Sequence, residues 1–234
     1  MVRSRRVLLI SGEYPPMEGG VADFTHLLGL AMAERGAEVH VLTSTKGAQP
    51  QTSAELRVHP LLASYRWGTL YRRVRQLIDQ VHPTVINIQY QAAAYAMHPA
   101  INLLPFFFRS VPVVVTFHDL LVPYLFPKAG RLRWGVNLAL ARSARACIAT
   151  NAQDQERLAR YPWMQRFPLQ PDPSQTRPAS TVNKVYLAQI PIGSNIVNAL
   201  PLGYDRAAWR RRLGLSEDAL ALCYFGFLNS SKGG

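Results

Sequence analysis

Polar side chains suited to binding or catalysis follow several short apolar runs in this 234-residue sequence. They are Glu13 after the run 7–11, Gln89 after 85–88, His118 and Asp119 after 113–117, and Asn151 after 146–149. An imidazole, a carboxylate or an amide at such a position can exchange hydrogen bonds with the hydroxyl groups or phosphate oxygens of a ligand. Because the carboxyl ends of parallel strands meet at one edge of a sheet, we expect these side chains to gather there and to contact a substrate.

A glycine pair, Gly19 and Gly20, stands directly before the first expected helix. Glycine lets the backbone approach an anion closely, and the free N–H groups of a helix N-terminus attract phosphate, so the pair suits a phosphate contact. A tight loop into the helix is the alternative, and the residues alone leave both open. The Gly-x-Gly-x-x-Gly fingerprint is missing, which disfavours a nicotinamide-dependent oxidoreductase.

His118 is the leading candidate for a catalytic contact, with Asp119 beside it to orient the ring or to bind a sugar hydroxyl. The alternative for a lone histidine is a hydrogen-bonded core or capping role. The sheet edge that His118 shares with the glycine loop favours the ligand contact. The other five histidines show no metal-ligand spacing, and Cys147 and Cys223 are too few for a four-cysteine zinc site or a disulfide framework. We therefore expect no metal and a reducing compartment.

Short apolar runs and amphipathic stretches alternate along the chain and would position these side chains. Strands are expected at residues 7–11, 38–43, 85–88, 113–117, 146–149, 184–190 and 219–225, and helices at about 20–35, 67–81, 92–108, 132–143 and 205–213. This alternation predicts an α/β fold with a Rossmann-like, doubly wound parallel sheet. Gly36 follows the first helix and is expected to cap it in a left-handed conformation.

The predicted domain organisation is one sheet-based domain followed by the start of another. The first domain covers residues 1–200 and includes a proline-rich insertion or linker at 161–180. A linker and helix follow at 201–218. The last segment, 219–234, reads as the first strand and loop of a second, truncated domain.

The charge balance, 26 Lys and Arg against 14 Asp and Glu, points to an anionic partner. Basic and aromatic residues mix at 65–75 and 124–134, which suits either an anionic membrane surface or a solvated helix face. No nucleic-acid-binding module is recognisable. The longest apolar stretch, 100–115, is broken by two prolines and an arginine, and the start has no signal-peptide core. We expect a cytoplasmic protein, with peripheral attachment to the inner face of the membrane as a further expectation.

Four segments, taken together and in this order, resemble glycosyltransferase family 4. They are 11–24 (SGEYPPMEGGVADF), 116–119 (TFHD), 192–196 (IGSNI) and 224–233 (YFGFLNSSKG). The resemblance implies a GT-B fold, in which two Rossmann-like domains face each other across a cleft. In that fold the first domain binds mainly the acceptor and the second mainly the nucleotide-sugar donor. It also implies retention of configuration at the anomeric carbon, without a required metal or other cofactor.

The resemblance assigns roles to four residues of this sequence. Gly19 and Gly20 resemble the loop that approaches the donor diphosphate, His118 the histidine that contacts the transferred sugar, and Lys232 the lysine that neutralises the departing diphosphate. One departure is Phe227, which stands where many family members have an arginine. The other is that the Glu-x₇-Glu segment of the family is absent from these 234 residues.

The predicted function is thus a retaining, nucleotide-sugar-dependent hexosyltransferase acting on a glycan or lipid-linked acceptor, in polysaccharide biosynthesis. Glu13, Gln89, Asp119 and Asn151 are the expected substrate-binding residues beside the glycine pair. Because the second domain is truncated, we expect this chain alone to be inactive. The alternative is a truncated, non-catalytic protein that binds an acceptor, a membrane surface or a partner protein.

Overall fold

A computed structural model of the chain describes residues 5–47, 56–120, 130–167, 184–194 and 199–223. The chain divides into two compact units, Met1–Ile192 and Gly193–Gly234. The division falls at Ile192, whereas the sequence places the end of the first domain at residue 200. The candidate site residues that the structure describes all belong to the first unit.

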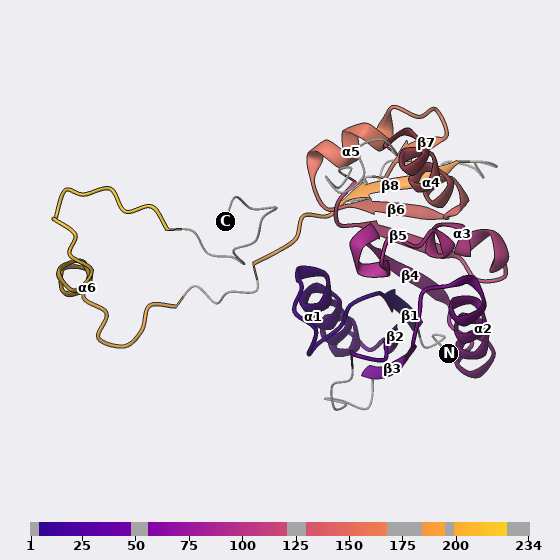
Figure 1. Ribbon diagram of the computed structural model, residues 1–234, viewed down its shortest axis with the longest axis horizontal. Helices are drawn as coiled ribbons and strands as arrows, with labels where there is room; N and C mark the ends of the chain where they lie inside the picture. The colour runs from indigo at the N-terminus through magenta and orange to yellow at the C-terminus, as the bar shows by residue number, and fades with distance from the viewer. Residues whose placement is uncertain (1–4, 48–55, 121–129, 168–183, 195–198, 224–234) are drawn as a thin grey trace, which may run out of the picture. The chain divides into compact units, whose positions relative to one another are not determined.

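The first unit is built on one sheet of eight parallel strands (Figure 1). The order across the sheet is β3-β2-β1-β4-β5-β6-β8-β7. The strands are β1 Arg6–Ser11, β2 Glu38–Ser44, β3 Leu56–Leu62, β4 Val85–Tyr90, β5 Val113–Phe117, β6 Ala146–Ala149, β7 Met164–Arg166 and β8 Val185–Gln189. The central strands read as nearly continuous apolar runs because helices cover both faces of the sheet. The predicted Rossmann-like parallel sheet is confirmed.

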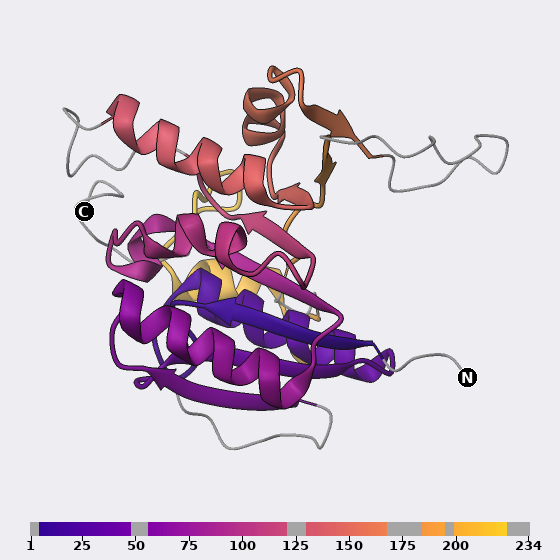
Figure 2. The same ribbon diagram turned by 90° about the vertical axis from the view of Figure 1, so that its right-hand side faces the viewer.

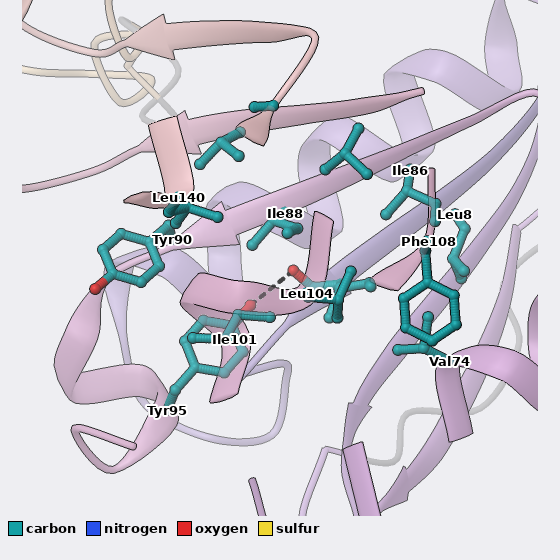
Figure 3. Packing of buried hydrophobic residues seen from close by; sticks show 14 of the residues in the cluster. Leu8, Val74, Ile86, Ile88, Tyr90, Tyr95, Ile101, Leu104, Phe108 and Leu140 are labelled. Atoms are coloured by element: carbon teal, nitrogen blue, oxygen red, sulfur yellow. Dashed lines mark hydrogen bonds between the residues drawn. The ribbon is translucent and has the colours of Figure 1, made fainter. Parts of the chain in front are cut away.

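Helices α1 (Gly20–Glu34), α2 (Trp67–Val81), α3 (Ala100–Phe107) and α4 (Gly130–Ser143) cover the sheet. Figure 2 shows α1 behind the strands and α2, α3 and α4 in front of them. Alternate side chains of β1 follow this division: Leu9 belongs to a small core with α1, and Leu8 to the large core with α2 and α3. Figure 3 shows part of the large core. Gly36 ends α1 with φ +80°, the left-handed cap that the sequence predicts.

The expected helix at 92–108 was wrong. A short 3₁₀ turn, η1 (Ala92–Tyr95), and α3 occupy this stretch. Between them Ala96 and Met97 have positive φ, and Pro99 disfavours a helical His98. Three elements were missed: the strands β3 and β7, and helix α5 (Ala152–Ala159), which contacts β6, β7 and β8.

The second unit contains helix α6 (Arg206–Arg212), where the sequence predicts it. Asp205 caps this helix by accepting a hydrogen bond from the Ala207 N–H. The expected strand at 219–225 was wrong over its described residues, 219–223, which form no strand. A strand needs a neighbour to satisfy its backbone groups, and no strand is described in this unit.

The strand order reverses at β1, which pairs with β2 on one side and β4 on the other. The connection from β1 runs through α1 on one face, and the connection into β4 runs through α2 on the opposite face. In open parallel sheets ligands bind beyond the carboxyl ends of the strands at such a reversal. A ligand site is therefore expected at the carboxyl ends of β1, β4 and β5.

Candidate functional site

Two hydrogen bonds hold the start of the loop after β1 in place. Ser11 Oγ donates to the Glu13 carbonyl oxygen at 2.6 Å, and the Tyr65 hydroxyl donates to the Gly12 carbonyl oxygen at 2.6 Å. A Cβ at position 12 would collide with the carbonyl group of Ala94, so glycine is required where the loop passes η1. These contacts fix the position of the loop beside the carboxyl end of β1.

The glycine pair lies where the loop enters α1, as expected. Gly19 is the N-cap residue and no side chain caps the helix, so the first N–H groups of α1 have no side-chain acceptor among the described residues. A Cβ at Gly19 would lie 2.5 Å from Glu13 Oε2, so the glycine leaves room for this carboxyl group. The helix N-terminus and the Glu13 carboxyl thus adjoin each other.

His118 follows β5 and its ring contacts α1. The Phe24 ring lies edge-on to the imidazole with the ring centroids 4.8 Å apart. The backbone is fixed on both sides, because the His118 N–H donates to the Tyr90 carbonyl oxygen at 3.0 Å and Thr150 Oγ1 donates to the Phe117 carbonyl oxygen at 3.1 Å. Through Phe24, His118 thus contacts the helix whose N-terminus the glycine pair forms.

A chain of buried polar groups sets the protonation of His118. Nε2 of the imidazole lies 2.8 Å from Gln89 Oε1, while Gln89 Nε2 donates to Asn87 Oδ1 at 2.5 Å. Thr116 Oγ1 also donates to Asn87 Oδ1, at 3.3 Å. Because Gln89 Oε1 can only accept, His118 Nε2 must carry the proton. Nδ1 is then a lone-pair acceptor, and it has no partner within the described part of the chain.

Burial shifts the pKa values of His118 and Glu13. It lowers the pKa of His118 to about 4, so the imidazole is neutral at physiological pH. It also raises the pKa of the Glu13 carboxyl above its ordinary value. A neutral imidazole cannot act as a general acid at pH 7, but its Nδ1 can accept a hydrogen bond from a sugar hydroxyl.

Other proposed substrate contacts are engaged within the protein. Gln89 is fully buried, and its amide is shared between His118 and Asn87. Asn151 caps α5: its Oδ1 accepts from the Asp154 N–H at 2.8 Å and its Nδ2 donates to Asp154 Oδ2 at 2.8 Å. Asp119 is half-buried beside His118. Lys232 lies outside the described residues.

Four residues of this site were not predicted from the sequence: Asn87, Thr116, Phe24 and Tyr65. Asn87 carries a visible signal, because it stands two residues before Gln89 in one strand and so faces the same side of the sheet. Thr116 and Phe24 lie within quoted motifs, but nothing in their residue types indicates a partner across the sheet. Tyr65 meets Gly12 from 53 positions away, a contact that no local pattern carries.

Neither a metal-binding cluster nor a membrane-spanning helix is found in the described ranges. No three His, Cys, Asp or Glu side chains there are arranged to hold a metal ion. None of the helices described combines the length and apolar character needed to traverse a bilayer.

Two solved chains that resemble this one come from a glycosyltransferase of the GT-B fold. Sucrose-phosphate synthase from Thermosynechococcus elongatus matches with a TM-score of 0.61 and 20% identity, over 92% of this chain and 53% of that one. A second, shorter chain of the same synthase matches with a TM-score of 0.53 and 16% identity, over 82% of this chain and 91% of that one. This chain therefore spans about half the length of the first synthase chain. At these identities the likeness establishes the fold.

The sequence comparisons give one result for the family and none for individual relatives. No curated protein sequence matches the chain. The model of Glycosyltransferase Family 4 matches residues 18–168, a stretch that runs from the glycine loop through His118 and α5 to the end of β7. This match covers well over half of the chain and agrees with the fold and with the motif residues at the sheet edge. The chain belongs to Glycosyltransferase Family 4.

Proposed function

We propose that this glycosyltransferase chain takes part in the transfer of a hexose from a nucleotide sugar to a glycan or lipid-linked acceptor, with retention of configuration at the anomeric carbon. The observation that carries the proposal is the contact of His118 with Phe24, which places a neutral imidazole beside the helix that the glycine pair begins. A donor bound here would have its sugar at the imidazole and its phosphates at the helix N-terminus. Both contacts match the chemistry of a sugar phosphate.

Each group has a distinct role in this proposal. The uncapped N–H groups at the start of α1 approach the donor diphosphate, where negative charge grows as the glycosyl–phosphate bond breaks. Nδ1 of His118 accepts a hydrogen bond from a hydroxyl of the transferred sugar. Lys232 neutralises the departing diphosphate. Glu13 and Asp119 contact substrate hydroxyls, and Gln89 and Asn151 act through the groups that they hold in place.

We also propose that the transfer needs no metal ion. Stabilisation of the leaving diphosphate is assigned to helix N–H groups and a lysine, which supply positive charge without a bound cation. Added chelator should then leave the turnover unchanged. A loss of turnover that Mg²⁺ or Mn²⁺ restores would contradict this part of the proposal.

A separate proposal concerns the activity of these 234 residues by themselves. The chain spans about half of the synthase chain that it matches, and in the GT-B fold the donor is bound mainly by the second domain. We therefore propose that these 234 residues alone show little or no turnover, while they retain the acceptor side of the site. Turnover by the 234-residue chain at saturating nucleotide sugar would contradict this proposal.

The test is an assay of the product of the complete reading frame that encodes this chain, with UDP-glucose, UDP-N-acetylglucosamine, GDP-mannose and ADP-glucose as donors. Release of nucleoside diphosphate identifies the donor, and the anomeric configuration of the product, read by NMR, tests retention. We expect one donor to dominate and its configuration to be retained. Inversion would overturn the retaining mechanism, and absence of release from all four would favour the non-catalytic alternative.

A further inference from the structure

The outer surface of α2 and α3 combines exposed aromatic rings with arginines. This α2–α3 surface consists of Arg66, Trp67, Arg72 and Arg75 on α2 and its N-cap, and Phe106, Phe107 and Arg109 at the end of α3. The exposed fractions of the aromatic residues are 39% for Trp67, 41% for Phe106 and 58% for Phe107. Exposed aromatic residues are uncommon on a surface that faces only water.

Ring contacts make the α2–α3 surface continuous. The Tyr71 ring lies between the two helices, with its centroid 5.6 Å from that of Trp67 and 4.8 Å from that of Phe107. Phe108 anchors the end of α3 in the core near Val74, as Figure 3 shows. Because Phe108 is buried, its neighbour Phe107 is held at the exterior. The exposed rings of Trp67 and Phe107 are thus linked through the Tyr71 ring.

Within the described part of the chain, the cations of this surface pair with no acidic side chain. Among the residues that the structure describes, Arg66, Arg72, Arg75 and Arg109 form no ion pair. Residues 61–150 hold ten Lys and Arg against two Asp and Glu, a net charge of +8 out of +12 for the whole chain. Arg75 also lies over the Phe108 ring, 5.4 Å from its centroid, which keeps this charge beside the aromatic residues. The α2–α3 surface is therefore strongly cationic.

We propose that the α2–α3 surface binds the surface of a bilayer that contains anionic lipids. Tryptophan and phenylalanine insert at the headgroup boundary, and arginines meet lipid phosphates, so this combination fits that partner in both chemistry and charge. The phosphates of a nucleic acid could pair with the arginines, but the chain has no recognisable nucleic-acid-binding module, and the exposed phenylalanines would have no role. The arginines and the exposed rings together favour an anionic bilayer over a nucleic acid as the partner.

The α2–α3 surface also adjoins the candidate site. Tyr65, one residue before the N-cap of α2, donates its hydroxyl hydrogen to the carbonyl oxygen of Gly12 in the loop after β1. The N-terminal end of the surface therefore lies beside the sheet edge that holds His118. A membrane-bound chain would present this edge to the headgroup region. Membrane binding goes beyond the proposed function, because it requires neither donor nor sugar transfer.

The test is flotation of the purified chain with vesicles, in the absence of any nucleotide sugar. One set of vesicles is pure phosphatidylcholine and the other contains 30% phosphatidylglycerol, each at low and high salt. We expect the chain to float with the anionic vesicles only, and high salt to release it. Equal flotation with both sets, or no flotation with either, would overturn the proposal. Binding to an RNA or DNA duplex without vesicle binding would also overturn it, in favour of a nucleic-acid partner.

Two variants test which surface is used. Arg72→Glu with Arg75→Glu should weaken binding to anionic vesicles by at least about 25-fold, roughly five-fold for each arginine lost. Phe106→Ser with Phe107→Ser should weaken it even at low salt. The four replaced side chains are exposed, so neither variant should change the circular dichroism spectrum of the chain.

Matched controls place the same changes elsewhere on the first unit. Arg35→Glu with Arg160→Glu carries the same charge change, and Phe167→Ser removes an aromatic residue that is 51% exposed. We expect both controls to bind vesicles like the wild type, apart from a modest effect of net charge. If the control charge variant weakens binding as much as Arg72→Glu with Arg75→Glu, net charge and not the α2–α3 surface explains the binding, and the proposal fails.

Discussion

His118 depends for its chemistry on polar side chains buried in the two neighbouring strands. Gln89 orients the imidazole, Asn87 orients Gln89, and Thr116 in turn donates a hydrogen bond to Asn87. Such a relay leaves one nitrogen protonated and the other free to accept a hydrogen bond. The position of His118 at a strand end could be predicted from the sequence. Its tautomer could not, because this depends on pairing between β4 and β5.

Replacement of Gln89 by leucine should disturb both stability and tautomer. The change leaves the His118 Nε2–H without its acceptor in a buried position, which costs about 1–3 kcal/mol of unfolding free energy. Urea denaturation measures that loss, and the ¹⁵N shifts of the imidazole should report a mixture of tautomers. Gln80→Leu, on the exposed end of α2, is the control. Unchanged ¹⁵N shifts in Gln89→Leu would contradict the relay.

The low pKa of His118 predicts a pH-dependent stability. Burial lowers the pKa to about 4 in the folded chain, against about 6.5 in the unfolded chain. Between these values the unfolded chain binds a proton that the folded chain does not, so the unfolding free energy falls as pH drops from about 6.5 to 4. His118→Gln should remove up to about 3 kcal/mol of this fall, measured by urea denaturation at pH 7 and pH 4.

His59, whose pKa is also lowered to about 4 by burial, by His40 and by Arg57, should contribute to the fall in the same pH range. The exposed His82 provides the control, as His82→Asn. If His118→Gln leaves the pH dependence of stability the same as in the wild type, the imidazole is not held neutral by the fold.

Helix α5 shows how an element can position the site without touching a ligand. Its cap residue Asn151 holds Asp154, and Asp154 Oδ2 accepts the N–H of Leu120 at 3.2 Å, two residues after His118. Asn151→Ala should therefore destabilise the chain by about 1 kcal/mol in urea denaturation. Asn151→Ser keeps a capping oxygen and should recover most of the loss. Equal stability of all three chains would show that this cap is dispensable.

At the scale of elements, prediction succeeded where local signals agree with the sheet. The bounds of α2 could be predicted from its apolar spacing, and those of α1 from its flanking glycines. The strand β3 was missed because it is an outer strand with Pro60 in its centre and polar residues at alternate positions. The break between η1 and α3 was missed because the apolar run across 92–108 hides the positive φ values of Ala96 and Met97.

The whole molecule divides into two units that differ in burial. The second unit exposes Leu200, Leu202, Leu220 and Leu222, each by more than two thirds, while the first unit contains both hydrophobic cores. Deletion of residues 193–234 should raise the soluble yield and change the unfolding free energy of the remainder by less than about 0.5 kcal/mol. A loss above about 1 kcal/mol in urea denaturation would show that the second unit stabilises the first.

The central claim is that His118, at the carboxyl edge of the parallel sheet, contacts the sugar being transferred. The most direct measurement is the kcat of His118→Ala in the product of the complete reading frame, compared with the wild type and with His82→Asn. We predict that His118→Ala lowers kcat by about 100-fold and that His82→Asn leaves it unchanged. A His118→Ala enzyme with the kcat and KM of the wild type would contradict the claim.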